Sequence, residues 1–122
     1  MVAHFVHSGE DGKLAVVAVL LAKGQANALL EELWKHLPQE KDKETLVDGI
    51  EINVAELLPA DRSYYSFPGS LTTPPCTEGV SWFVLKTPTE ISSAEIDQFA
   101  RLYPHNARPV QPLNGRTVLK TK

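Results

Sequence analysis

The sequence predicts an α+β chain that is rich in β-strands and carries few, short helices. Residues 2–7 alternate in the manner of a half-buried strand, and residues 13–22 form an almost unbroken apolar, β-branched run. Such a run is typical of a central strand that is covered on both faces. Apolar residues recur at helical spacing after Asn27 and after Ser92. Together these patterns predict a sheet with short helices at its periphery.

The composition describes one folded unit and excludes several classes of function. The chain has 122 residues, of which 43% are hydrophobic and 22% charged, so it is one domain or less on a scale of about 150 residues per domain. Its net charge is −3 and its basic residues are scattered, which argues against a nucleic-acid partner. No apolar run approaches the roughly 20 residues that span a bilayer, and no signal-peptide pattern opens the chain. We therefore expect no membrane segment and no export signal in this chain.

The first third of the chain predicts a hairpin followed by a helix. Residues 8–12, Ser-Gly-Glu-Asp-Gly, have the turn chemistry of a hairpin loop between the two strands. The helix after them has Asn27 as its N-cap and ends at Pro38. The apolar residues at helical spacing are Leu29, Leu30, Leu33, Trp34 and Leu37.

The middle of the chain predicts a surface loop, a short capped turn and two strands. Residues 39–48 are charged and indicate a loop, after which Ile50 and Ile52 favour an extended chain. Asn53, with Glu56 three residues later, has the pattern of a capping box over a turn that ends at Pro59. The β-branched and aromatic residues of segments 63–67 and 80–85 predict a strand in each.

The last third predicts a second helix and a turn-rich tail. Ser92 and Glu95 form another capping box, and Pro104 ends the helix that follows. Asn114-Gly115 is a turn signal, and residues 117–119 can form a final strand. We find no internal repeat and no linker. The apolar face of the second helix is predicted to consist of Ile96, Phe99, Ala100 and Tyr103.

Two of the four histidines stand in the segment His4-Phe5-Val6-His7. On a helix they would share a face, but on a strand residues three apart point to opposite faces. We predict a strand, so His4 shares its face with Val6 while His7 points away. Two histidines alone make no zinc site, so a hydrogen-bonded core or interface role stays open for both. His36 and His105 are expected at the surface.

The segment Gly69-Ser-Leu-Thr-Thr-Pro-Pro-Cys76 is the second chemical feature. Its two prolines hold the chain in a stiff, extended form, and Gly69 permits a close approach of the backbone. One interpretation is a rigid connection between strands. The other is a loop that presents Thr72 and Thr73, hydroxyl and N–H together, to a small anion or a metal-bound oxygen.

Cys76 is the only cysteine in the chain. It has no partner for an intramolecular disulfide, and one cysteine is too few for a zinc site built on several thiolates. Cys76 is then either a small buried apolar residue or a thiol whose partner lies on another chain or segment.

In these features the chain resembles an α-class carbonic anhydrase of bacterial type. The resemblance covers nearly the whole chain and runs through ordered blocks with matching spacing. They are the His-x-Val-His strand at 4–7, the next strand at 12–17, Gly-Ser-Leu-Thr-Thr-Pro-Pro at 69–75, Glu-Gly-Val-Ser-Trp at 78–82, Val-Leu-Lys at 84–86 and the closing segment at 106–116.

The resemblance implies a fold and an activity. The fold is a portion of the family's mainly antiparallel central sheet with short peripheral helices. Residues 1–122 match the C-terminal half of the domain, and the N-terminal half is absent. The activity is the zinc-dependent, reversible hydration of carbon dioxide to bicarbonate and a proton. Zinc held by three neutral imidazoles lowers the pKa of its water to about 7.

The resemblance also assigns roles to individual residues. His4 matches one of three zinc ligands, and His7 is then expected to be buried on the far face of its strand. Thr72 matches the catalytic threonine, whose hydroxyl accepts a hydrogen bond from the zinc-bound hydroxide and whose N–H binds the anion. Thr73 matches a position that contacts bicarbonate. Carbon dioxide has no net dipole, so its wall is apolar, and the residues that match this wall are Val6, Val16, Leu71 and Trp82.

Several family features fall outside the matched segment. The other two zinc-binding histidines, the acidic residue that orients the threonine and the proton-shuttling histidine lie upstream in the family. Val2 stands where the family usually has a glutamate that supports the ligand histidine. Cys76 matches a position that is bridged to the missing half in exported bacterial members. The resemblance therefore implies a periplasmic or secreted location for the full-length protein.

Three interpretations remain open from the sequence. The chain is a portion of a carbonic anhydrase whose partner is the missing half or a second copy. Alternatively, it is a non-catalytic, anhydrase-like binding domain, or a scaffold fragment without activity. For the isolated chain we expect weak catalysis or none, because one histidine cannot build a catalytic zinc site. We also expect low stability or oligomerisation, because unpaired strands favour pairing with another chain.

Overall fold

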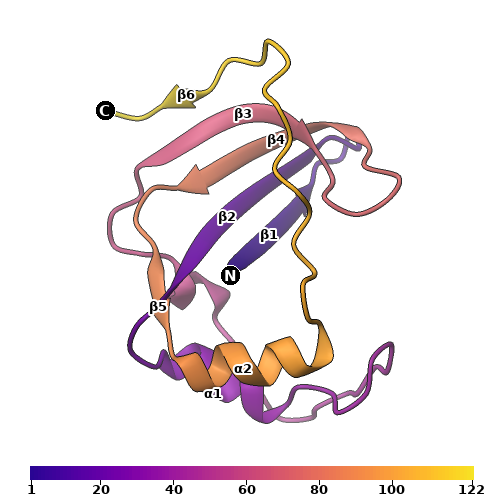
Figure 1. Cartoon of the computed structure of the whole chain (residues 1–122), viewed down its shortest axis with the longest axis vertical. Coiled ribbons are helices and arrows are strands. Elements are labelled where there is room, and N and C mark those ends of the chain that lie inside the picture. The colour runs from indigo at the N-terminus through magenta and orange to yellow at the C-terminus, as the bar shows by residue number, and fades with distance from the viewer.

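The computed structural model describes all 122 residues and confirms a β-rich α+β chain. Its twisted sheet stands above two short helices, and the C-terminal tail climbs from the second helix to the far end of the sheet (Figure 1). The elements are β1 (Val2–Ser8), β2 (Leu14–Lys23), α1 (Ala28–Lys35), the 3₁₀ helix η1 (Val54–Leu57), β3 (Tyr64–Ser70), β4 (Glu78–Leu85), β5 (Thr89–Ile91), α2 (Ser93–Leu102) and β6 (Leu119–Lys120).

The sheet is mixed, and β2 lies in its interior as its sequence predicts. The strand order is β1-β2-β4-β3-β6, and β5 pairs with the end of β2. β1 with β2, β3 with β4 and β3 with β6 are antiparallel, whereas β2 is parallel to both β4 and β5. The hairpin between β1 and β2 is confirmed. No helix in the chain has the length and apolar character that crossing a bilayer requires.

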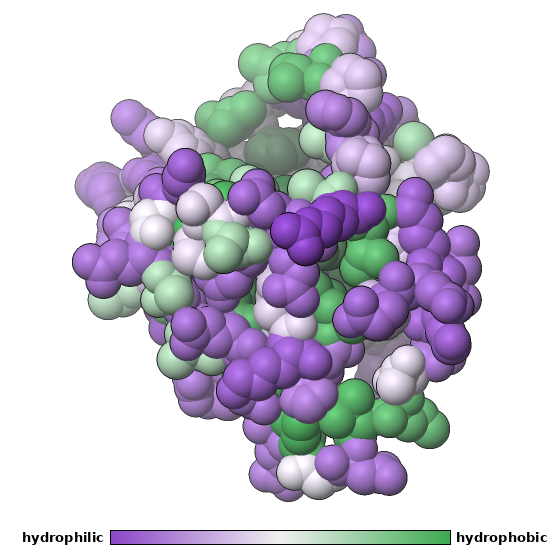
Figure 2. Space-filling model, turned by 60° about the horizontal axis from the view of Figure 1, so that its bottom comes forward, coloured by the Kyte–Doolittle hydropathy of each residue, from purple (hydrophilic) through white to green (hydrophobic).

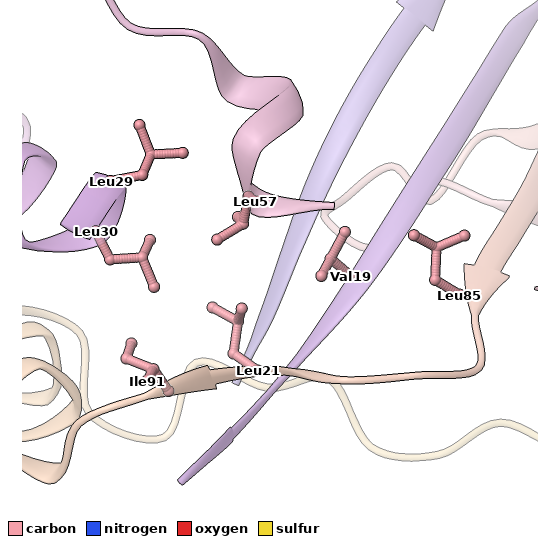
Figure 3. Packing of buried hydrophobic residues seen from close by; sticks show 7 residues of the cluster. All are labelled: Val19, Leu21, Leu29, Leu30, Leu57, Leu85 and Ile91. Atoms are coloured by element: carbon pink, nitrogen blue, oxygen red, sulfur yellow. The ribbon is translucent and has the colours of Figure 1, made fainter. Parts of the chain in front are cut away.

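Alternation along β2 creates two separate apolar clusters, one on each face of the sheet. Val19 and Leu21 point toward the helices, where Val19 is fully buried. In Figure 3, α1 contributes Leu29 and Leu30, η1 contributes Leu57, and these side chains converge on β2. We call this cluster the helix-side core; its buried members are Val19, Leu21, Leu29, Leu30, Leu57, Leu85 and Ile91.

The opposite face, which we call the open face, has no helix against it. Its cluster consists of Val16, Ala18, Val80 and Trp82, and all residues packed around it come from strands or from the loop after β3. Apolar side chains elsewhere are dispersed: Leu46 is 96% and Val110 is 97% exposed. Figure 2 shows the helix end of the molecule as a largely hydrophilic surface with separate apolar areas.

Both helices begin at the predicted caps. The Asn27 side chain accepts hydrogen bonds from the N–H groups of Leu29 and Leu30. Ser92 and Glu95 form the predicted capping box at the start of α2. Asn53 caps η1 through the N–H of Ala55, but Glu56 does not complete a second box.

Three expectations, about which residues are buried and where the last strand lies, were wrong. His7 is exposed, because the helix-side core covers Ala3 and Phe5 of β1 and ends before His7. On α2, Ala100 and Tyr103 are exposed, and Glu95 is buried instead, since the capping box draws its carboxylate inward. The final strand lies at Leu119–Lys120, slightly later than expected. β5 was not anticipated, because three residues are too few to show alternation.

The capping box of α2 gives a stability prediction. The Ser92 hydroxyl donates to Glu95 Oε2 at 2.6 Å and accepts from the Glu95 N–H at 3.3 Å. We expect Ser92→Ala to lower the free energy of unfolding by about 1–2 kcal/mol, since it removes one hydrogen bond to the buried Glu95 carboxylate and one to the Glu95 backbone N–H. Urea unfolding measures the loss. Ser93→Ala, at an exposed position that makes no side-chain hydrogen bond, is the control, and equal losses for the two would contradict the prediction.

Candidate functional site

The register of the sheet aligns four apolar side chains in one row across the open face. Val6 pairs with Val16, Val16 pairs with Trp82, and Trp82 pairs with Phe67 on β3. Paired residues in adjacent strands point to the same face and lie about 4.8 Å apart. Val16 and Trp82 are buried, whereas Val6 is 59% exposed. The row therefore brings together three of the four residues predicted for an apolar wall, and the fourth, Leu71, packs against the same cluster from the loop after β3.

His4 lies beside this row, on the same face of β1 as Val6. Its imidazole contacts the Trp82 indole edge to face, with ring centroids 5.0 Å apart and an interplanar angle of 82°. Partial burial lowers the pKa of His4 below its usual value of 6.5. The imidazole is therefore neutral at pH 7, which is the form that a metal ligand needs.

Trp82 is held in place from three sides. Its indole N–H donates to the Ser70 carbonyl at 3.0 Å. Its ring is stacked on Phe67 with centroids 6.3 Å apart and an interplanar angle of 3°. A Cβ atom at Gly69 would lie only 2.7 Å from Trp82 Cδ1. The close approach predicted for Gly69 is confirmed, and the atoms it approaches are those of the indole.

The loop after β3 places the predicted threonines at the surface beside the wall. Leu71 packs against the open-face cluster, and its N–H donates to the Thr77 carbonyl at 2.9 Å. The Cys76 N–H donates to the Thr73 carbonyl at 2.8 Å, which closes the loop. Thr72 and Thr73 are exposed, and their hydroxyls and N–H groups make no hydrogen bond within the chain. These donors and acceptors are free to bind a ligand.

Cys76 is a half-buried free thiol at the end of this loop. Its φ of 57° lies in the left-handed region, which non-glycine residues seldom adopt. It is only half-buried, so it is not the small buried apolar residue that one interpretation expected, and a thiol partner outside this chain stays a prediction.

The chain does not hold a complete zinc site. Nowhere do three or more His, Cys, Asp or Glu side chains gather in a way that could bind a metal. His7 Nδ1 lies 3.0 Å from the Phe5 carbonyl, and His36 Nε2 lies 3.3 Å from Glu32 Oε1. His105 follows α2 and is exposed. His4 is therefore the one imidazole that this chain brings to the open face, and a single imidazole does not fit zinc.

Comparison with known proteins identifies the family. The family model for eukaryotic-type carbonic anhydrase matches residues 5–122. The chain belongs to this carbonic anhydrase family. A carbonic anhydrase from Klebsiella pneumoniae is 45% identical over 122 residues, which cover 98% of this chain and 49% of that protein. The chain spans about half the length of the curated relatives it matches.

Solved structures agree with the fold. A hyperthermostable carbonic anhydrase from a hydrothermal vent chimney superposes with a TM-score of 0.93 at 42% identity, covering 99% of this chain and 54% of that one. Dioscorin, solved in complex with ascorbate, superposes with a TM-score of 0.85 at 32% identity, covering 98% of this chain and 52% of that one. The family and the β-rich fold expected from the sequence are both confirmed.

Two residues around the site were not found by sequence reasoning. Phe67 stacks on Trp82, and alternation along β3 from Tyr65 and Gly69 could have placed it on the same face. Arg116 lies with its guanidinium carbon 5.8 Å from the centre of the Phe67 ring and donates to the Pro68 carbonyl. No local pattern in the tail signals this contact, because it depends on where the tail crosses β3.

The contact between Gly69 and Trp82 predicts the effect of one methyl group. We expect Gly69→Ala to lower the free energy of unfolding by about 1–3 kcal/mol, since the added Cβ forces the buried indole out of its position. Urea unfolding provides the measurement. Gly9→Ala is the control, because its Cβ would meet chiefly the exposed Asp11 carboxylate, which can rotate away. A loss no larger than that of Gly9→Ala would show that Trp82 is not confined.

The lowered pKa of His4 predicts the pH dependence of stability. A histidine whose pKa is lower in the folded state than in the unfolded state binds its proton less strongly when the chain is folded. His4 therefore costs no stability above pH 6.5, and destabilises the fold as the pH falls below 6.5 through its folded pKa. NMR titration of the His4 Cε1 proton, assigned with His4→Gln, measures this pKa. We expect a midpoint below that of the same proton in urea, and an equal or higher midpoint would contradict the partial desolvation of the His4 imidazole.

Proposed function

We propose that this chain is the part of a zinc-dependent carbonic anhydrase that supplies the carbon dioxide wall, one zinc ligand and an anion-binding loop. The observation that carries the proposal is the row of Val6, Val16 and Trp82 beside His4 on the open face. Family membership supports it, because the family activity is the reversible hydration of carbon dioxide. Zinc, when bound, supplies the activated water of that reaction.

The chain's own residues suit the substrate and the product. Carbon dioxide lacks a net dipole, so it gains from contact with an apolar surface and has little need of hydrogen-bond donors. The wall of Val6, Val16, Leu71 and Trp82 offers such a surface. Bicarbonate carries a charge, and the free hydroxyl and N–H of Thr72 and Thr73 can donate to it. We infer that Thr72 orients the reacting oxygen and that Thr73 contacts the product.

The proposed zinc site needs ligands from outside this chain. His4 is its one imidazole here, and three imidazoles are needed to bind catalytic zinc in this way. We propose that the remaining part of a carbonic anhydrase domain supplies the others, since the chain spans about half the length of its relatives. A second copy of the chain is the other possible source.

We also propose a periplasmic or secreted location for the full-length protein. The support is Cys76, a half-buried thiol without a partner in this chain, at the position that exported bacterial members bridge to their other half. Disulfides of this kind persist in oxidising compartments.

The second candidate is a non-catalytic binding domain. The incomplete donor set favours it, because a binding domain has no need of three imidazoles. Dioscorin, which shares the fold and was solved with ascorbate, shows that an organic ligand can be held by a member of this fold. The binding domain predicts a folded complex with the missing part that takes up no zinc.

Reconstitution separates the two functions. The chain is dialysed against a weak chelator, alone and after mixing with the N-terminal part of the Klebsiella relative, and zinc content and carbon dioxide hydration are measured. Alone, we expect no bound zinc and no hydration above buffer. The mixture is expected to bind about one zinc per complex and to lose its activity to a strong chelator.

The decisive variant in this experiment is a substitution of His4. We expect His4→Gln to lower the activity of the mixture by more than about 100-fold, because the loss of a ligand exceeds that of a residue that only supports one. His7→Gln, at an exposed position on the other face of β1, is the matched control and should stay within about twofold. A folded mixture that binds no zinc would overturn the catalytic proposal and favour the binding domain.

A further inference from the structure

Four side chains form a column that runs across the sheet from the C-terminal tail to β1. The guanidinium carbon of Arg116 lies 5.8 Å from the centre of the Phe67 ring. The Phe67 ring is stacked on the indole of Trp82, and the indole meets the His4 imidazole edge to face. Since the strand order is β1-β2-β4-β3, Trp82 lies between His4 and Phe67. We call these four residues the aromatic column.

The indole is the group within this chain that orients the His4 imidazole. Of the four histidines, only His7 and His36 have a hydrogen-bond partner for the ring. Metal-binding histidines are usually oriented by a hydrogen bond to the second ring nitrogen. The side chains nearest to His4 on its face of the sheet cannot supply one, because they are apolar. They are Val2 and Val6 on β1 and Ala18, the partner of His4 on β2.

Phe67 confines the indole on the side that faces away from His4. The hydrogen bond from the indole N–H to the Ser70 carbonyl fixes one atom of the ring, so the ring can still tilt about that atom. Phe67 is the direct partner of Trp82 on β3, and its ring is parallel to the indole to within 3°. Without this flat ring, the indole could move toward β3 and lose its contact with the imidazole.

Arg116 in turn holds the Phe67 ring from the tail. Its guanidinium donates to three backbone carbonyls: Nε to Leu113 at 2.9 Å, Nη1 to Pro68 at 3.1 Å and Nη2 to Pro112 at 3.0 Å. Because Pro68 follows Phe67 on β3, these bonds join the tail to the strand directly beside the ring. The planar guanidinium can also lie against an aromatic ring, and a lysine ammonium cannot reproduce this set of bonds.

We propose that Phe67 and Arg116 are positioning residues of the candidate site. Phe67 holds the indole of Trp82 in the place where it orients the His4 imidazole, and Arg116 holds Phe67. The catalytic meaning of this inference rests on the proposed function, in which the imidazole is a zinc ligand and the indole is part of the carbon dioxide wall. The positioning itself depends only on contacts within this chain.

NMR of the chain alone, at a pH well above 6.5, tests the positioning. The ring current of Trp82 should displace the His4 ring protons from their shifts in urea. We expect Phe67→Leu to lose most of this displacement and Phe67→Tyr, which keeps a flat ring, to retain it. Phe83→Leu is the matched control, since it makes the same change on the other face of β4, where Phe83 contacts Tyr64. Equal displacements in Phe67→Leu and Phe83→Leu would overturn the proposal.

Arg116→Lys tests the column without a change in the apolar core, and so serves also where Phe67→Leu fails to fold. We expect it to reduce the displacement of the His4 ring protons in the same direction as Phe67→Leu, but by less. Arg62→Lys is its control, because Arg62 is exposed and its side chain makes no hydrogen bond within the chain. A displacement in Arg116→Lys equal to that in Arg62→Lys would overturn the role of Arg116.

Hydration of carbon dioxide tests the catalytic meaning. In the mixture with the N-terminal part of the Klebsiella relative, we expect Phe67→Leu to lower kcat/KM by about tenfold or more, as for residues that support a metal ligand. Phe83→Leu should keep the value of the parent, and complex formation is measured in parallel. An inactive parent mixture would overturn the proposed function, and the NMR result would still decide the positioning. An active parent mixture without a loss in Phe67→Leu would overturn the role of Phe67 in catalysis.

Discussion

The structure depends on one constraint: β2 is apolar on both faces, so both faces of the sheet must be covered. Its odd-numbered residues are covered by α1, η1 and β5, which explains why these elements lie on one side of the sheet. Its even-numbered residues are covered only by neighbouring strands and the loop after β3. This asymmetry separates a face that stabilises the fold from a face that carries the candidate site. Val16 both stabilises the fold and forms part of the candidate site, because it is buried within the sheet and lies at the centre of the apolar wall.

Local signals in the sequence predicted the elements but not all of their partners. Caps at Asn27 and Ser92 located both helices, because a cap acts within one turn of the chain. The parallel pairing of β2 with β4 depends on contacts between distant segments, and no local pattern encodes it. The burial of His7 was mispredicted for a related reason: alternation gives the face of a residue, whereas its burial depends on how far the opposing layer extends.

In the candidate site, too, local patterns predicted single residues, whereas contacts between distant strands became visible only in the fold. Alternation along β1 was enough to place His4 and Val6 on one face, and Gly69 indicated a close backbone approach. The position of Trp82 between His4 and Phe67 follows from the register of three strands and became visible only in the fold. The residues proposed to contact substrate were suggested by resemblance to a family, and the placement of Val6, Val16 and Trp82 on one face of the sheet agrees with that proposal.

The long separation between β2 and β4 has a consequence for how the chain is made. The β1–β2 hairpin is local and can form early, but β2 gains its inner neighbour only when Trp82 pairs with Val16. At about 5–20 residues per second of synthesis, the hairpin waits for several seconds with an apolar strand uncovered. Contacts between distant residues also slow folding after release. The apolar surface of β2 is therefore uncovered for longer during synthesis than that of a strand whose neighbours all lie close in the sequence.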